Sequence, residues 1–435
     1  MTAPEGVASG ESQDELAPTP SQRMRSHDEL ADYLLEIGAT LAAYGCPSYR
    51  LEDVIRAVAE AEGYRAEPFA LPTGLFLRVV PRTTGNERVA DVHRMARLSD
   101  WGVDLGRLTL VDEIFNDVVD RKASIEEARA RIRAVVKKPP IWSPALVWAA
   151  TTVSAGAAAV FFRGSMVDVL VASIVGAVIG GTRSLLDRNP AHRLLTDFLG
   201  GLFAAMCAWL ATRVWSSAAP EVIVLAGAIS LFPGMTFTTG LAEVAQKNLV
   251  SGGARLMESS VTLLLILFGV ALVAGLQKLF GVGPLVEAIP HTGLGLTYQA
   301  VALAVSALAF AVLFQVPRRY LWAALVSGAT GYAVTALAVR HLPEAPHVAA
   351  FCAALAVCVL ANLLARLTNR PAQLFQLPWM ILLVPGSFGF VSLGELLAKK
   401  PEEGVQAAFT MALVGAALVI GVLVANVVMP ARKLL

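Results

Sequence analysis

Two short stretches of the chain carry a proline followed by a glycine inside an apolar run: residues 231–235 read LFPGM, and residues 383–387 read LVPGS. The offset that separates the two prolines also relates Glu243 to Glu395. Proline removes a backbone donor and clashes with the preceding turn, whereas glycine tolerates unusual dihedral angles. The pattern predicts two interrupted helices at matching positions of a repeated unit.

The sequence around these stretches is apolar enough to cross a membrane many times. Of its 435 residues, 56% are hydrophobic and 16% are charged, and the charges are concentrated before Pro139. A helix needs about 20 apolar residues to span the hydrocarbon core of a bilayer. We therefore expect a mainly α membrane protein with about ten transmembrane helices, at residues 145–162, 166–185, 194–215, 221–239, 254–280, 298–316, 320–339, 347–367, 375–396 and 405–429.

The ten expected helices form two sets of five that follow each other in the same order. Residues 139–281 make the first five-helix membrane repeat and residues 282–435 the second. Because five is an odd number, the second copy would enter the membrane from the opposite face. Inverted repeats of this kind are typical of secondary transporters, which bind their solute where the repeats meet.

The charged N-terminal part predicts a small soluble α+β domain over residues 27–138, preceded by a disordered tail at residues 1–26. The tail is polar and lacks the apolar core of a secretory signal. Periodicity and turn residues predict helices near 28–44 and 47–63, strands at 65–70 and 75–80, a third strand or short helix at 88–97, and helices at 104–119 and 124–136.

Lysine and arginine beside the expected helices predict the orientation. If the N-terminal domain is cytoplasmic, the inner flanks carry more of these residues than the outer flanks. Cytoplasmic loops are enriched in Lys and Arg. We therefore expect a multi-pass protein of the cell (plasma or inner) membrane with both termini in the cytoplasm.

Several of these segments, in this order, resemble the threonine/serine exporter family. They are GAT at 38–40, YRLED at 49–53, LPTG at 71–74, LFPG at 231–234 and LVSGGARL at 249–256, with LVPGS at 383–387 similar to the family's C-terminal membrane module. The resemblance covers nearly everything from about residue 28 onward. It implies export of threonine and serine from the cytoplasm, driven by the proton motive force.

A threonine or serine zwitterion presents a carboxylate, an ammonium and a hydroxyl, each of which needs a partner inside the membrane. The helix N-termini at the two breaks could bind the substrate carboxylate, and nearby hydroxyl side chains could form hydrogen bonds with the substrate hydroxyl. The expected substrate-binding residues are those at and just after the breaks: Pro233, Gly234, Thr236, Thr238, Pro385, Gly386 and Ser387.

Coupling to protons needs a titratable group, and ionisable residues within membrane helices are functional candidates. The candidates are Asp197, Glu243, Glu258 and Glu395, of which the first two rank highest. Their positions toward helix ends are equally compatible with capping or with side chains that reach the membrane surface.

Other functions stay open at this point. A channel, or a transporter of another small polar solute, would fit the same topology. A membrane-tethered hydrolase using the N-terminal domain is less favoured, because that domain shows no G-x-S-x-G, no phosphate-binding loop and no zinc spacing. We expect no cofactor, no metal and no nucleic-acid partner for a chain of net charge +1, whereas a homo-oligomer is compatible with these features.

Overall fold

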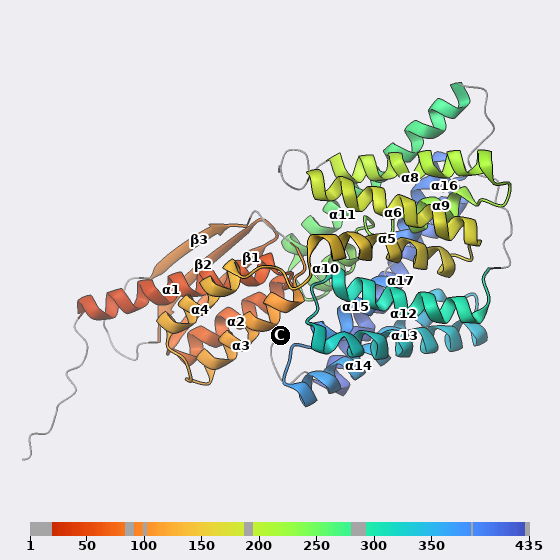
Figure 1. Ribbon diagram of the computed structural model, residues 1–435. Helices are drawn as coiled ribbons and strands as arrows, with labels where there is room; N and C mark the ends of the chain where they lie inside the picture. The colour runs from red at the N-terminus through yellow and green to blue at the C-terminus, as the bar shows by residue number, and fades with distance from the viewer. Residues whose placement is uncertain are drawn as a thin grey trace, which may run out of the picture.

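The computed structural model describes residues 20–82, 91–98, 102–186, 195–279, 293–383 and 386–430. The described chain is mostly helical and contains a three-stranded antiparallel sheet with the strand order β1-β2-β3. The sheet and the first four helices form the N-terminal region, which lies at one end of a bundle of membrane helices (Figure 1). We call that end of the bundle the near end and the opposite end the far end.

The N-terminal region follows the expected order of elements. Its elements are α1 (Pro20–Ala43), α2 (Ser48–Ala61), β1 (Tyr64–Leu71), β2 (Gly74–Pro81), β3 (Val92–Arg97), α3 (Leu105–Val119) and α4 (Ile125–Lys137). The segment expected as a strand or a short helix is a strand, β3. Helix α1 begins inside the expected tail, so disorder through residue 26 was wrong for the part that is described; residues 1–19 lie outside it.

Capping residues begin two of these helices as the sequence predicts. The side chain of Asp104 accepts a hydrogen bond from the backbone of Arg107, and that of Ser124 accepts one from Glu127. Each satisfies an amide that has no partner within its own helix.

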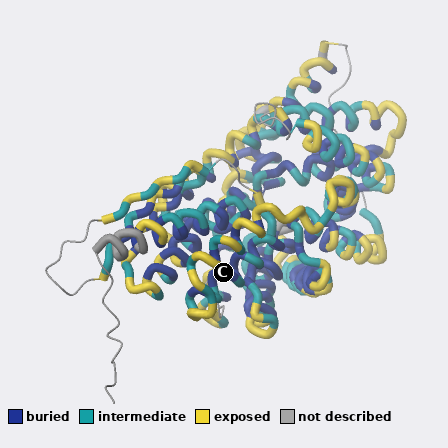
Figure 2. Tube along the Cα trace, turned by 60° about the vertical axis from the view of Figure 1, so that its left-hand side comes forward, coloured by how far each residue is buried: buried dark blue, intermediate teal, exposed yellow. Residues whose placement is uncertain are grey.

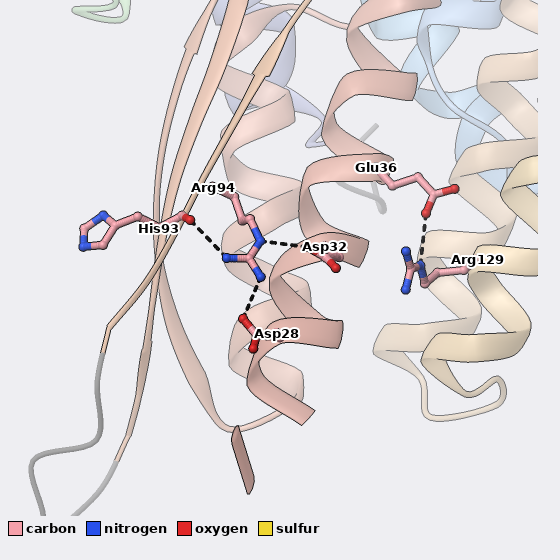
Figure 3. Close-up of polar contacts among 6 residues, drawn as sticks. All are labelled: Asp28, Asp32, Glu36, His93, Arg94 and Arg129. Atoms are coloured by element: carbon pink, nitrogen blue, oxygen red, sulfur yellow. Dashed lines mark hydrogen bonds and ion pairs between the residues drawn. The ribbon is translucent and has the colours of Figure 1, made fainter. Parts of the chain in front are cut away.

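Ion pairs fasten α1 to its neighbours (Figure 3). Arg94 on β3 donates to Asp28 at 2.6 Å and to Asp32 at 2.7 Å. Arg129 on α4 donates to Glu36 at 3.0 Å. These partly exposed pairs fix orientation more than they add stability, since such pairs contribute about 0–1 kcal/mol each.

The membrane bundle contains eight described helices that are long and apolar enough to span a bilayer. They are α5 (Pro144–Phe161), α6 (Met166–Leu186), α8 (Leu195–Val214), α11 (Leu249–Leu279), α12 (Leu296–Leu313), α13 (Leu321–His341), which follows the 3-10 turn η1 (Arg318–Tyr320), α14 (Pro346–Thr368) and α17 (Pro401–Val428). In these helices the residues that face outward are mostly exposed, and those that face the interior of the bundle are mostly buried (Figure 2). The chain is a multi-pass membrane protein.

The fourth expected span is divided in two, as its Pro-Gly pair predicts, into α9 (Pro220–Gly227) and α10 (Gly234–Ala245). The ninth is described as α15 (Gln373–Leu383) and α16 (Gly386–Leu397). Both second pieces begin at the glycine of a Pro-Gly pair. The second expected break itself falls on residues 384–385, which lie outside the described residues.

Some helices of the two halves have equal lengths. Helices α5 and α12 both contain 18 residues, and α10 and α16 both contain 12. The same left-handed backbone follows each pair: Arg163 and Gln315 have φ of 60° and 56°, and Lys247 and Lys399 have φ of 66° and 64°.

Helices α5 and α12 run in opposite directions. The backbone N–H of Trp142, just before α5, donates to the Gln315 side chain at 2.9 Å, and its indole donates to Val316, just after α12. The start of α5 therefore lies beside the end of α12, at the near end. At the far end, Asp168 in the first turn of α6 accepts from the backbone of Ala219 before α9.

Candidate functional site

The two helix breaks meet inside the bundle. A Cβ added to Gly386 at the start of α16 would lie 3.5 Å from the backbone N and Cα of Gly234 at the start of α10, and 3.0 Å from the Cβ of Phe232. The ring of Phe232 packs on that of Phe390, with 5.4 Å between the centroids. A Cβ at this position requires Phe232 to shift by a few tenths of an ångström, and a larger side chain would press the two helices apart. Glycine therefore allows their N-termini to approach.

Proline and glycine produce this geometry locally. Pro233 precedes the first turn of α10, and its carbonyl accepts the first helical hydrogen bond from Phe237. The leading amides of a helix have no partner within it and carry partial positive charge. Two such N-termini that meet at one point favour an anionic group between or beside them.

A cavity of about 300 Å³ begins one turn beyond the first break. Thr238 lines it and donates its hydroxyl back to the carbonyl of Gly234 at 3.0 Å. The cavity walls come from five helices of different parts of the chain. The polar and charged lining residues are Tyr49, Arg50 and Asp53 of α2, Thr238 and Thr239 of α10, Gln246 just after it, Arg255 of α11, Gln373 and Gln376 of α15, and Asn426 of α17.

Glu243 forms the most buried polar cluster beside this cavity. Its side chain has no exposed surface, and one carboxylate oxygen accepts from the backbone N–H of Ser48 at 2.9 Å. The other accepts from the Ser251 hydroxyl at 2.7 Å and from Nε of Arg255 at 3.1 Å. The hydroxyls of Ser48 and Ser251 also lie 2.7 Å apart. One carboxylate thus joins α2, α10 and α11.

A buried thiol stands beside the start of α2. Burial raises the pKa of Cys46 to about 12, and the nearby positive charges of Arg50 and Arg255 only partly oppose this. A thiol with so high a pKa stays protonated, so Cys46 is not poised as a nucleophile.

The expected substrate-binding residues fall into three groups. Pro233, Gly234 and Gly386 form the meeting point of the two breaks, and Thr238 lines the cavity. Thr236 is buried on α10 and Ser387 is half-buried on α16. Pro385 lies outside the described residues.

The four candidate proton carriers have different surroundings. Glu243 is buried as described above, and Asp197 is half-buried in the first turn of α8. Glu258 is exposed on α11, and Glu395 lies 3.5 Å from Lys400 at the end of α16. The cluster around Glu243 is the one that adjoins the cavity.

Sequence reasoning missed the partners of Glu243 and the contribution of α2 to the cavity. Arg255 was counted only as a charge flanking a membrane helix, and Ser251 only as part of a motif. The available signal was that an acid and an arginine bracket the short turn between α10 and α11. No sequence pattern indicated that Ser48 would meet them.

Two family models match the chain. One, described as "Putative threonine/serine exporter", matches residues 32–277, and the other, described as "Threonine/Serine exporter, ThrE", matches residues 299–428.

Curated fungal proteins are also similar to the chain. "Uncharacterized protein C7D4.12c" of Schizosaccharomyces pombe is 28% identical over 56% of this chain and 32% of its own length. "Pheromone-regulated membrane protein 10" is 22% identical both in Yarrowia lipolytica, over 84% of this chain and 30% of that protein, and in Eremothecium gossypii, over 84% and 49%. The chain thus spans between about a third and a half of the length of these relatives. No solved structure matches the chain significantly.

Proposed function

Because the chain belongs to the threonine/serine exporter family, we propose that it exports threonine and serine from the cytoplasm, driven by the proton motive force. The observation that carries this proposal is the cavity of about 300 Å³ beside the paired helix breaks. Ligand sites in proteins begin at about this volume. The cavity has room for one small amino acid.

The lining offers a partner for each group of a hydroxy amino acid. Arg50 and Arg255 supply positive charge for the carboxylate, and Thr239 supplies a hydroxyl for the side chain. The amide oxygens of Gln376 and Asn426 can accept from the ammonium. The lining also contains the carboxylate of Asp53, so it offers both positive and negative groups to a zwitterion with no net charge.

The transport cycle that we propose is alternating access between two inverted five-helix repeats, residues 139–281 and 282–435. The equal lengths of α5 and α12 and of α10 and α16, and the opposite directions of α5 and α12, support the inversion. In transporters of this architecture the halves move around a site built from discontinuous helices. The meeting point of α10 and α16 occupies that position.

Glu243 is our first candidate for the group that carries the proton. It adjoins the cavity, and a change in its charge would alter three hydrogen bonds that join its own helix, α10, to α2 and α11. Asp197 is the second candidate, from its place in the first turn of α8. We propose that both termini face the cytoplasm, which puts the near end of the bundle on the cytoplasmic side of the cell membrane.

The driving force is large enough for the proposed coupling. Export of a neutral solute against a hundredfold gradient costs about 2.8 kcal/mol. One proton that enters through about 100 mV returns about 2.3 kcal/mol. One proton therefore suffices for modest gradients, and two are needed for steep ones.

Counterflow in proteoliposomes tests the function. Vesicles that contain the purified protein and unlabelled threonine should transiently accumulate labelled threonine, and serine should compete. Net uphill transport should require an imposed proton gradient and stop with an uncoupler. A channel would equilibrate label without transient accumulation, and a transporter of another solute would show no saturable counterflow of threonine; either result would overturn the proposal.

A further inference from the structure

The start of α2 is bound to the membrane part of the first half. The backbone N–H of Ser48, the first residue of α2, donates to Glu243 at 2.9 Å, and its hydroxyl meets Ser251 of α11 at 2.7 Å. A carboxylate at a helix N-terminus is favoured by the helix dipole and by the unpaired leading amides. The contact is small and polar, and Arg255 holds the carboxylate from the other side at 3.1 Å.

The N-terminal region is attached to the second half in a different way. Its apolar core continues without a boundary into the near ends of α12 to α15, where Phe310, Phe314 and Phe375 are buried in the same cluster. The backbone N–H of Leu105 on α3 donates to the carbonyl of Phe314 at 2.9 Å. This attachment is broad and apolar.

A region fixed to both halves would prevent their relative movement. Alternating access requires that one half moves against the other, so one of the two attachments has to release in each cycle. Separation of the second attachment would expose buried aromatic side chains to water, whereas separation of the first would expose groups that water can solvate. The contact between α2 and Glu243 is the one suited to open and close.

Release of this contact would also open the cavity. Tyr49, Arg50 and Asp53, in the first turns of α2, form its wall on the side of the N-terminal region. We infer that α2 is the gate of the cavity at the near end, that Glu243 positions it in the closed state, and that the N-terminal region moves with the second half when the gate opens. The inference rests on the proposed transport function and gives the N-terminal region a part in it.

A reversible cross-link tests the gate. Ser48→Cys and Ser251→Cys in one full-length chain would place two thiols where the hydroxyls now lie 2.7 Å apart, within the short range that a disulfide requires. The protein is reconstituted, oxidised with copper phenanthroline, and assayed for counterflow of labelled threonine before and after dithiothreitol. Each single variant controls for pairing with native Cys46.

A second pair of cysteines controls for cross-linking itself. Ala307→Cys and Gly328→Cys join α12 to α13 within the second half, where a Cβ on residue 328 would lie 3.3 Å from that of Ala307. Oxidation should lower counterflow by about tenfold or more in the gate pair, because a closed gate blocks access to the site. Dithiothreitol should restore it, and the control pair should lose much less.

Two results would overturn the gate. One is failure of the gate pair to form a disulfide, since the α2–α11 contact would then be absent in the membrane. The other is counterflow that is the same in the oxidised and reduced protein. Loss of threonine counterflow in the reduced variants and in the unmodified protein alike would instead refute the proposed function.

Discussion

Glu243 is fully buried and is also our first candidate for the group that carries the proton. Its carboxylate is fully buried and receives hydrogen bonds from a backbone amide, a hydroxyl and a guanidinium. A buried charge is tolerated only where such partners replace water. The arrangement is therefore sensitive to any loss of charge on this side chain.

Glu243→Gln should lower the melting temperature and slow threonine efflux. The variant keeps the shape of the side chain but leaves Arg255, which is 3% exposed, without its countercharge. Breaking a buried pair in this way costs about 3–5 kcal/mol. Thermal melting in detergent and efflux from preloaded vesicles measure the two effects.

Glu258→Gln is the matched control, since Glu258 is an exposed acid on the adjoining helix α11. Its melting temperature should stay close to that of the unmodified protein. Equal melting temperatures of Glu243→Gln and Glu258→Gln would show that the hydrogen bonds of Glu243 do not stabilise the protein as the structure indicates.

The sequence could identify Glu243 but not its partners. Its offset to Glu395 made both acids candidates, yet Glu395 pairs with a mostly exposed lysine while Glu243 is buried. The difference comes from Ser48, which is distant in sequence and is brought there by tertiary packing. Local patterns carry no information about such a contact.

At the scale of the elements, the pairs α9–α10 and α15–α16 are the helices beside which we propose that a solute binds. The short helices α10 and α16 begin at Gly234 and Gly386, whose backbones are in close contact. Neither Gly234 nor Gly386 is among the described glycines that have a positive φ. Glycine therefore serves here to let the two helices approach, and not to allow an unusual backbone conformation.

Gly386→Val should abolish most transport. The new side chain would press on Phe232 and Gly234, and overpacking costs about 1–3 kcal/mol, which corresponds to a loss of about fivefold to 150-fold if it acts on the transport step. Gly394→Val is the control on the same helix, because a Cβ there meets nothing within 4 Å.

Efflux and the amount of protein in the membrane are measured for both variants. Full efflux by Gly386→Val would mean that the two breaks do not need to approach each other. Loss of the protein from the membrane in Gly394→Val as well would point to a general intolerance of α16.

Element-scale features were the most predictable part of the fold. Apolar run length located eight spans, Pro-Gly located the breaks, and Asp104 and Ser124 located helix starts. Run length alone could not show that 221–239 and 375–396 are each two helices, because both pieces of a broken span are apolar. The sequence also could not show that α2 lines the cavity, because this depends on how the N-terminal region packs against the membrane helices.

At the scale of the whole molecule, we propose that the two halves face opposite sides of the membrane. The loops that follow the matched helices α8 and α14 lie at opposite ends of the bundle: the first adjoins Asp168 at the far end, and the second adjoins α3 through the ion pair of Arg370 with Glu113. Ser217 and Asn369 are exposed in these two loops.

Ser217→Cys should react with a membrane-impermeant maleimide in intact cells, whereas Asn369→Cys should react only after the cells are permeabilised. The opposite sides follow from inversion of the repeats, and the cytoplasmic side of residue 369 follows from the excess of Lys and Arg on the inner flanks. The unmodified protein gives the background from the native cysteines. Labelling of both variants from the same side would refute the inversion.

The attachment of the N-terminal region to one end has an energetic consequence for the empty carrier. Two inverted repeats without an N-terminal region would open toward either face of the membrane at a similar cost in free energy. With the proposed gate, only one opening requires a carboxylate to part from a helix, so the two openings would differ in free energy before any solute or proton arrives. The unloaded protein should therefore rest with its cytoplasmic entrance shut, and the substrate itself must supply part of the work of opening it.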